Sequence, residues 1–532
     1  MSRLAHFESA GIASGRPLVL GARAMVVTPS AWASSVGLEV LRAGGTAVDA
    51  AVAVGAALSV AHPNQCGLGG DAFWLIRPRG DATFALNASG RAPAGAAAGD
   101  LLDRGLTEIT PRSPFAVTVP GMVGGWRDAH ARFGRTELAR LIAPAIEAAE
   151  RGLAVTPLLA RYIRSSEEVL RARPEATRIF LPGGRAPAVG HVLRQPDLAG
   201  TLRAIARDPG AFYTGAPAGA IAAAIAAEGG WLDAGDLAAH ASDWVQPLTA
   251  PFGGWDVQEM PPNSQGITAL MGLALIGAAG LSGADAPAAW AGAGIAAART
   301  FMAVRDREIA DPASMRRTPQ ELLDLRFLRG AQHEPCGPAE TAATPAGDTV
   351  HFAIVDEDGT AVSCIQSVFD IFGSGIVVPG TGILLQDRGR SFSLDDAHVN
   401  ALRPGRRPMH TLAPGLALQD GRTAAVFGCM GGHAQTQVHV QLLSALAGRG
   451  ADPVEAVSAP RWVLGAPPER ATVLAEDRDG LPELLEAGGH AVERVDPFSP
   501  AMGNAQVIVA DEDTGVLAGA ADPRSDGAAL GY

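Results

Sequence analysis

Lysine is absent from the sequence of 532 residues, so arginine supplies all of the positive side-chain charge. The formal net charge is −13, and no basic run interrupts the acidic balance. Because binding to nucleic acids depends on basic side chains that neutralise phosphates, we expect no nucleic-acid partner. Hydrophobic residues make up 47% of the chain and charged residues 18%, which is typical of a globular protein.

Cysteine is scarce as well. The four cysteines, Cys66, Cys336, Cys364 and Cys429, form no C-x-x-C pair and have no metal-ligand spacing. We therefore expect free, buried thiols, and we predict neither a metal nor another cofactor.

The sequence also lacks a long, strongly apolar run. Its longest uncharged stretch, residues 267–283, is rich in glycine and alanine, whereas a membrane span needs about 18 or more strongly apolar residues. This stretch predicts a buried core helix and no membrane partner. Residues 1–17 place glycine and proline where a secretory signal has its apolar stretch, so we expect a cytoplasmic protein.

Two alanine-rich helical patterns occupy residues 28–60, with Gly44 and Gly45 between them. Both would be apolar around nearly the whole circumference of the helix, which predicts interior helices that pack against a sheet. A glycine loop at residues 66–70 then runs into a predicted strand. Because a strand rather than a helix follows it, this loop is a poor candidate for binding phosphate. Further along, residues 305–312 predict a charged helix end with a solvated or ion-paired face.

The most informative junction lies near residue 349. Residues 330–348 contain prolines and no apolar periodicity, which is typical of a functional or disordered segment. Residues 349–355 and 361–368 then alternate with a period of two around Asp358-Gly359, which predicts a β-hairpin. A segment without a structural pattern thus ends at a core strand whose first residue is Thr349.

Thr349 has two interpretations from its position alone. It could simply begin a strand. If the chain were cut before it, however, its free α-amine, with a pKa near ~8, would be a base next to its hydroxyl and would activate it as a nucleophile.

The motifs around this junction favour the second interpretation, because they resemble the γ-glutamyltranspeptidase family. The similarity runs from about residue 20 to the C-terminus. Its matching stretches are residues 44–53, 67–73, 119–121, 348–356, 372–375, 382–385, 406–408, 428–432, 459–461 and 521–525. The resemblance implies an α+β fold of the N-terminal-nucleophile hydrolase type, a four-layer α-β-β-α sandwich. It also implies a precursor that is cut between Asp348 and Thr349 into a large subunit, residues 1–348, and a small subunit, residues 349–532, which together form one globular unit.

The same resemblance assigns catalytic roles. Thr349 would be the nucleophile, first toward the Asp348 carbonyl and then toward a small-molecule amide substrate. Gly431 and Gly432 match the glycine pair that forms the oxyanion hole, although an ordinary strand-to-helix turn is the alternative. Ser367 stands where the family has a threonine that hydrogen-bonds the nucleophile's amine. The alternative interpretation is that Ser367 is a serine on a strand face without this role.

The residues that bind glutamate in the family differ here. Ser89 replaces the family's arginine, and Arg91 lies two positions away. Phe369 replaces an asparagine, Ser391 replaces the carboxylate that would hold an α-ammonium, and Arg388 stands nearby.

The family's serine pair is His410 and Thr411 in this sequence. His410 could hydrogen-bond a substrate carboxylate or fill the pocket wall. Because a guanidinium binds a carboxylate and repels an ammonium, these changes indicate a substrate with a carboxylate and no α-amine.

Three functions follow from these residues. The first is an autoprocessed amidohydrolase for an oxamate-like or glutaryl-amide-like substrate. The second is a true γ-glutamyl hydrolase or transpeptidase, and the third is an uncut, inactive scaffold or binding protein. The retained Thr349, Ser367, Gly431 and Gly432 argue against the third. The sequence leaves open whether the acyl acceptor is water or an amine, and whether the protein forms a homodimer.

Overall fold

The computed structural model describes residues 17–332, 347–465, 472–511 and 513–532. Its central hairpin joins β10 (Gly347–Val355) to β11 (Ala361–Asp370), as the alternating sequence predicts. Val350 and Phe352 face one hydrophobic cluster, whereas Ala353 and Val355 face another. A strand that is buried on both faces requires a packed layer on each side.

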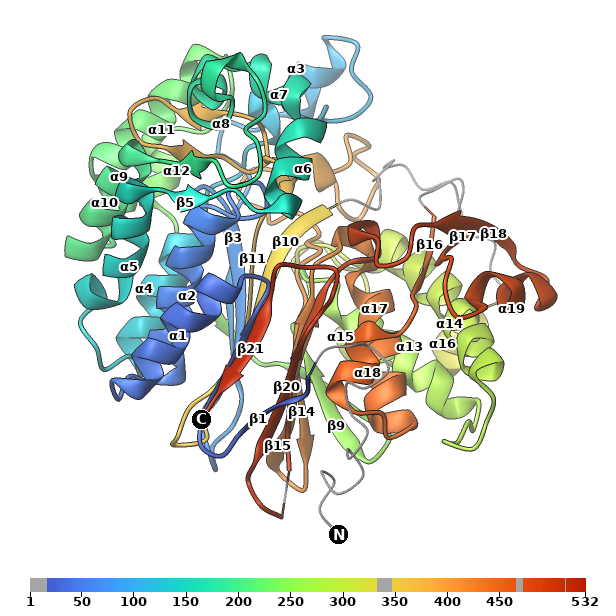
Figure 1. Ribbon diagram of the computed structural model, residues 1–532. Helices are drawn as coiled ribbons and strands as arrows, with labels where there is room; N and C mark the ends of the chain where they lie inside the picture. The colour runs from blue at the N-terminus through green and yellow to red at the C-terminus, as the bar shows by residue number, and fades with distance from the viewer. Residues whose placement is uncertain (1–16, 333–346, 466–471, 512) are drawn as a thin grey trace.

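Two seven-stranded antiparallel sheets supply the two central layers (Figure 1). In spatial order, one contains β21 (Ala528–Gly531), β2 (Met25–Thr28), β10, β11, β3 (Asp71–Arg77), β4 (Phe84–Ala88) and β7 (Asp243–Val245). The other contains β1 (Val19–Gly21), β20 (Leu517–Ala521), β19 (Ala505–Ala510), β15 (Arg422–Cys429), β14 (Pro414–Gln419), β9 (Trp255–Glu259) and β8 (Leu248–Phe252). Val27, Phe73 and Ile365 of the first sheet meet Leu416 and Ile508 of the second in the core between them.

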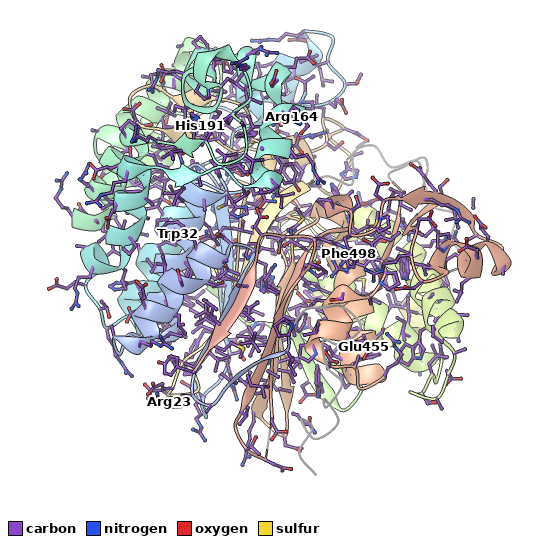
Figure 2. The ribbon with its side chains drawn as sticks, viewed as in Figure 1. Arg23, Trp32, Arg164, His191, Glu455 and Phe498 are labelled. Atoms are coloured by element: carbon purple, nitrogen blue, oxygen red, sulfur yellow. The ribbon has the colours of Figure 1, made fainter. Side chains whose placement is uncertain are left out.

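Helices cover the outer face of each sheet, which completes the predicted four-layer α-β-β-α sandwich. The layer over the β10 sheet contains α1 (Ala31–Arg42), α2 (Ala47–Ala61), α4 (Met122–Phe133), α5 (Leu138–Arg151), α9 (Pro196–Arg207), α10 (Ala211–Thr214), α11 (Ala216–Ala227) and α12 (Ala234–Ala238). The layer over the β15 sheet contains α13 (Gly266–Ala278), α14 (Pro287–Glu308), α16 (Leu325–Ala331), α17 (Gln435–Leu443), α18 (Pro453–Ser458) and α19 (Leu481–Ala487). Trp32 and Glu455 mark the two helical layers on opposite sides of the sheets (Figure 2).

Smaller elements surround these layers. They are α3 (Ala98–Leu102), α6 (Pro157–Ser165), α7 (Glu167–Arg171), α8 (Pro174–Phe180), α15 (Pro319–Leu322), the strand pairs β5 (Leu153–Ala154) with β6 (Val192–Leu193) and β12 (Val377–Val378) with β13 (Ile383–Leu384), and a sheet of β16 (Trp462–Leu464), β17 (Thr472–Glu476) and β18 (Ala491–Val495). The short helices are η2 (Pro114–Ala116), η3 (Pro182–Gly184), η4 (Arg388–Ser391), η5 (Gly432–Ala434), η6 (Ser444–Gly448) and η8 (Pro500–Met502).

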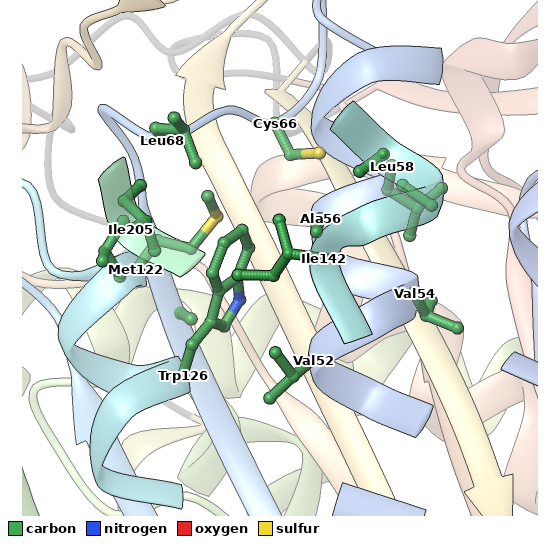
Figure 3. Close-up of a cluster of buried hydrophobic side chains, with 14 of the residues drawn as sticks. Val52, Val54, Ala56, Leu58, Cys66, Leu68, Met122, Trp126, Ile142 and Ile205 are labelled. Carbon is green, nitrogen blue, oxygen red and sulfur yellow. The ribbon is translucent and has the colours of Figure 1, made fainter. Parts of the chain in front are cut away.

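Both predicted alanine-rich helices are present as α1 and α2. Thr46 caps α2 in a reciprocal capping box with Asp49, and Asp356 accepts the Ala47 N–H at 2.8 Å. Small residues let α2 lie close to β11: a Cβ at Gly55 would stand 2.6 Å from Oε1 of Gln366. Figure 3 shows the apolar side chains of α2 packed with the indole of α4 and with residues of α5 and α9.

Residues 267–278 of the apolar stretch lie in the largely buried helix α13, as predicted, whereas residues 279–283 follow the helix and are mostly exposed. In the part of the chain that the structure describes, no helix has both the length and the apolar character needed to cross a membrane. Cys66, Cys364 and Cys429 are free and buried, as expected, whereas Cys336 and most of the 330–348 segment lie outside the described residues.

The glycine loop before β3 serves close backbone packing. A Cβ at Gly69 would stand 2.2 Å from the Leu384 carbonyl oxygen, and one at Gly70 would stand 2.2 Å from that of Ser367. Side chains at these positions would therefore clash with backbone. The loop brings Asp71, the first residue of β3, close to the strand that carries Ser367.

Candidate active site

Thr349 lies near the start of β10 at an irregularity in the hairpin. Asp348 pairs with Phe369 and Val350 pairs with Gln366, so the register shifts across Thr349. A bulge of this kind breaks the regular ladder and redirects a side chain. Thr349 is 1% exposed, and its hydroxyl donates to Oγ of Ser367 at 3.2 Å.

Ser367 links Thr349 to the backbone at Phe369, near the end of β11. Its Oγ also accepts the N–H of Phe369 at 2.8 Å. Phe369 has φ of 79°, which is unusual for a bulky residue and has to be held by its surroundings. The hydroxyl at position 367 therefore fixes both the candidate nucleophile and the backbone that carries Phe369.

Arg388, in η4, lies against the ring of Phe369. The Cζ of Arg388 is 3.8 Å from the ring centroid, and its Nη1 donates to Oγ1 of Thr411 at 2.9 Å. The guanidinium is fully buried, yet among the described residues its Nε and Nη2 have no hydrogen-bond partner. Burial lowers the pKa of Arg388 to about 10, so it remains a cation at neutral pH. Nε and Nη2 share one edge of the guanidinium, and this edge matches the two oxygens of a carboxylate.

His410 is fully buried beside Asp71. Its Nε2 is 3.0 Å from Oδ2 of Asp71, and its Nδ1 accepts the Leu412 N–H at 3.3 Å. Both ring nitrogens are thus engaged, and the ring packs edge-on against Phe73 with centroids 4.8 Å apart. The hypothesis that His410 hydrogen-bonds a substrate carboxylate therefore loses support, because the ring has no N–H left to donate.

Asp71 joins the loops that carry Gly90, Gly121 and His410. Its Oδ1 accepts the N–H groups of Gly90 at 2.9 Å and Gly121 at 3.2 Å, while its Oδ2 faces His410. Burial raises the pKa of Asp71 to about 6, against the opposing attraction of Arg388 and the N–H donors. From the sequence, Asp71 has no assigned role beyond its place in a family motif.

The raised pKa of Asp71 predicts a pH-dependent stability difference. Since the pKa lies above the ordinary value of 3.8, the stabilisation from this group is fully present below about pH 4 and is lost as the pH rises through about 6. Asp71→Asn keeps an acceptor for the glycine N–H groups and removes the titration. The free energy of unfolding of the variant relative to wild type should rise by about 3 kcal/mol between pH 4 and pH 7. This change is measured as a rise in the melting temperature of the variant relative to that of wild type. A constant difference between the two proteins would contradict this.

Gly431 and Gly432 lie between β15 and α17, at the start of η5, so the turn is indeed a strand-to-helix turn. Their φ angles of 136° and 53° belong to the region that favours glycine. The first N–H groups of a helix have no intrahelical acceptor and are available to a ligand. This geometry suits an oxyanion hole as well as it suits a turn.

Two motifs that match the family, residues 459–461 and 521–525, pack next to the glycine pair. Arg461 donates to the Gly503 carbonyl at 2.8 Å and pairs with Asp522 at 2.5 Å, and both charged residues are buried. The backbone of Gly503 lies against Gly431, where an added Cβ would be 3.3 Å from the Gly503 Cα. The 459–461 and 521–525 motifs thus hold the loop that follows β15.

The remaining predicted residues differ in how they are placed. Arg91 is partly exposed; its Nη2 pairs with Asp243 at 3.0 Å and its Nη1 donates to the Gly405 carbonyl, so both terminal nitrogens already have partners. Ser391 ends η4, and its buried Oγ has no hydrogen-bond partner among the described residues. The structure thus gives Arg388, and not Arg91, the open edge that a carboxylate needs.

Gln265, a fully buried residue at the N-terminus of α13, was missed by the sequence reasoning. Its Nε2 donates to the carbonyl oxygens of Thr411 at 2.9 Å and Gly432 at 3.0 Å. The signal in the sequence was weak: a short polar run, residues 263–265, just before an apolar helix.

Comparison with known proteins agrees with this geometry. The family model described as Gamma-glutamyltranspeptidase matches residues 33–532. An oxamate amidohydrolase proenzyme of Klebsiella pneumoniae subsp. pneumoniae is 39% identical over 538 residues, which cover 96% of this chain and 98% of that protein. A glutathione hydrolase-like YwrD proenzyme of Bacillus subtilis is 37% identical over 530 residues, with 96% and 99% covered. The crystal structure of a cephalosporin acylase from Bacillus halodurans aligns with a TM-score of 0.90 at 36% identity, with 97% of each chain covered.

The chain therefore belongs to the γ-glutamyltranspeptidase family. It is an enzyme, an amidohydrolase of the N-terminal-nucleophile type.

Proposed function

We propose that the chain is a proenzyme that cuts itself between Asp348 and Thr349, and that the mature enzyme hydrolyses the amide of a small carboxylate-bearing acid. Relatives named as proenzymes support the processing step. The arrangement of strands supports it too, since β10 and β11 pair on either side with β2 and β3. The two fragments would therefore stay joined by a shared sheet after the cut.

In the processing step, the Thr349 hydroxyl attacks the Asp348 carbonyl. The peptide C–N bond breaks as an ester forms, and the proton of the hydroxyl passes to the released amine. Water then hydrolyses the ester, which leaves residues 1–348 with a C-terminal carboxylate and Thr349 with a free α-amine. That amine, with an intrinsic pKa near ~8, is the base for the mature enzyme.

Turnover repeats this chemistry on the substrate. The α-amine takes the proton of the Thr349 hydroxyl as its oxygen attacks the amide carbonyl, and the N–H groups of Gly431 and Gly432 stabilise the oxyanion. The protonated α-amine then gives its proton to the leaving amine, which departs and leaves an acyl ester on Thr349. Water hydrolyses this ester and releases the acid. Ser367 holds the nucleophile throughout.

The open Nε–Nη2 edge of Arg388 is the observation that carries the substrate proposal. A buried cation with two unused donors on one edge is costly unless a ligand completes it. A carboxylate satisfies both donors and neutralises the charge. This edge of Arg388 therefore suits the monoamide of a dicarboxylic acid, which is the chemistry that the name of the Klebsiella relative describes.

An α-ammonium has no good partner at this place. Serine stands at position 391, and the neighbouring acid, Asp387, is fully buried. Burial, together with the charge of Asp370, raises the pKa of Asp387 well above its ordinary value, which disfavours the anionic form that an ammonium would need. A γ-glutamyl substrate would thus bring its ammonium close to Arg388, where the oxygens of the nearby acid Asp71 are already engaged by His410 and by the Gly90 and Gly121 N–H groups.

The test compares two anilides that differ only in the α-amine. Glutaryl p-nitroanilide should have a higher kcat/KM than γ-glutamyl p-nitroanilide. Arg388→Ala should remove about ten- to a hundredfold of activity toward the glutaryl compound, as expected for one charge-assisted contact of ~1.5–3 kcal/mol. Ser391→Asp should shift the preference toward the γ-glutamyl compound.

Arg91→Ala is the matched control, because Arg91 is already paired with Asp243. It should leave the ratio of the two kcat/KM values unchanged. A wild-type preference for the γ-glutamyl anilide would reject the carboxylate proposal and identify a γ-glutamyl enzyme. A change of ratio in Arg91→Ala alone would transfer the role to Arg91.

A further inference from the structure

We propose that Gln265 is a positioning residue that sets the distance between the carboxylate-binding arginine and the oxyanion hole, and thereby selects the length of the substrate's acyl chain. This inference rests on the proposed function, because it needs Arg388 and Gly432 to contact the same substrate. Gln265 itself contacts neither the substrate nor the reacting atoms.

The amide of Gln265 joins two loops that are distant in sequence. One loop, before β14, carries Thr411, and the other, after β15, carries Gly432. Nε2 of Gln265 donates to the carbonyl oxygens of both, and the Gln265 N–H donates to the His410 carbonyl at 2.7 Å. Since β14 and β15 are paired strands, these loops emerge at the same end of one hairpin.

Arg305, from the end of α14, fixes the orientation of this amide. Its Nη1 donates to Oε1 of Gln265 at 3.0 Å and lies 2.9 Å from Nδ1 of His433, while Asp306 pairs with the rest of the guanidinium. Arginine can only donate, so the oxygen of the Gln265 amide has to face it and the NH₂ has to face the two carbonyls. The charged helix end predicted from the sequence is ion-paired as expected, but Arg305 is 4% exposed and points inward.

Each carbonyl that Gln265 holds is linked to one end of the proposed substrate. Oγ1 of Thr411 accepts from Arg388 Nη1 at 2.9 Å, so the Thr411 loop sets where the free Nε–Nη2 edge lies. Gly432 carries one of the N–H groups assigned to the oxyanion. A substrate whose carboxylate and scissile carbonyl match the distance between these groups fits both contacts. Shorter and longer acids can satisfy only one of them.

The experiment measures kcat/KM for the mono-p-nitroanilides of dicarboxylic acids from oxalic to adipic acid. Gln265→Met keeps the length of the side chain and removes both N–H donations. We expect wild type to prefer one chain length strongly. In the variant, kcat/KM for that length should fall about ten- to a hundredfold, because small misplacements of catalytic groups have effects of this size. For the poorly fitting chain lengths kcat/KM should fall much less, so kcat/KM should depend less on chain length in the variant than in wild type.

Gln441→Met is the matched control. Gln441, in α17, also donates its Nε2 to two backbone carbonyls, those of Trp462 at 2.8 Å and Gln437 at 3.1 Å. Its replacement should lower the melting temperature and leave the length profile unchanged. If Gln265→Met does not fold, Gln265→Glu serves in its place, since it keeps a contact with Arg305 and still loses the two donations.

The outcomes separate the two proposals. If the variant loses the same factor at every chain length, Gln265 has only a structural role and the inference is rejected, while the proposed function stands. If wild-type enzyme hydrolyses none of these anilides, the carboxylate proposal fails and this inference fails with it. A flattened profile in Gln441→Met as well would show that general loosening produces the effect, which also rejects the inference.

Discussion

Thr349→Ala should leave a single uncut chain of 532 residues with no amidohydrolase activity, whereas wild type should separate into residues 1–348 and 349–532 on a denaturing gel. The methyl side chain cannot attack the Asp348 carbonyl, so the α-amine is never released. Loss of a covalent nucleophile reduces turnover on the order of 10⁴-fold or more. Intact-mass analysis of both proteins gives the position of the cut to the residue.

Two companion variants sharpen this test. Thr349→Ser retains a hydroxyl and should still be processed, although more slowly. Thr360→Ala changes a threonine at the turn of the same hairpin and should be processed like wild type. A wild-type chain that hydrolyses amides without being cut would reject the mechanism, as would processing of Thr349→Ala at the same bond.

Gly432→Ala should have the second largest effect, with kcat reduced about 10²- to 10³-fold, the usual result of losing one oxyanion donor. Gly432 has φ of 53°, and alanine in this left-handed region costs about 1–2 kcal/mol. The backbone will relieve that strain by rotating, which turns the N–H away from the substrate oxygen. Steady-state kinetics on processed enzyme, with melting temperatures measured alongside, separates loss of catalysis from loss of stability.

Gly421→Ala provides the matched comparison. Gly421 lies at the β14–β15 turn with φ of 76°, and an added Cβ would meet no atom within 4 Å. The substitution imposes a similar backbone strain away from the site. Both variants should therefore lose similar stability, but only Gly432→Ala should lose turnover. Equal effects on kcat would favour the interpretation of Gly431 and Gly432 as an ordinary turn.

Much of the fold was predictable because its signals are local. The period-two hairpin around Asp358-Gly359, the helices separated by Gly44-Gly45 and the buried helix α13 each depend on residues close together in the sequence. The four-layer arrangement came from the resemblance and is confirmed by the two sheets and their helical layers. Local periodicity indicates that a segment is a strand, but it does not identify the segments that cover its two faces.

Some features of the candidate site were likewise predictable from the sequence, and others were visible only in the folded structure. The sequence by itself placed Thr349 at the start of a core strand, and the resemblance then singled out Ser367, Gly431, Gly432, Arg388 and Thr411. Tertiary structure alone decided that Arg388 rather than Arg91 keeps an open edge, because Asp243, over a hundred residues from Arg91, pairs with the latter. It likewise decided that His410 is fully engaged by Asp71 and that Gln265 joins two loops. Hydrogen-bond valence is the physical reason: a side chain has few donors and acceptors, and which of them remain free for a substrate depends on neighbours that only the folded chain brings together.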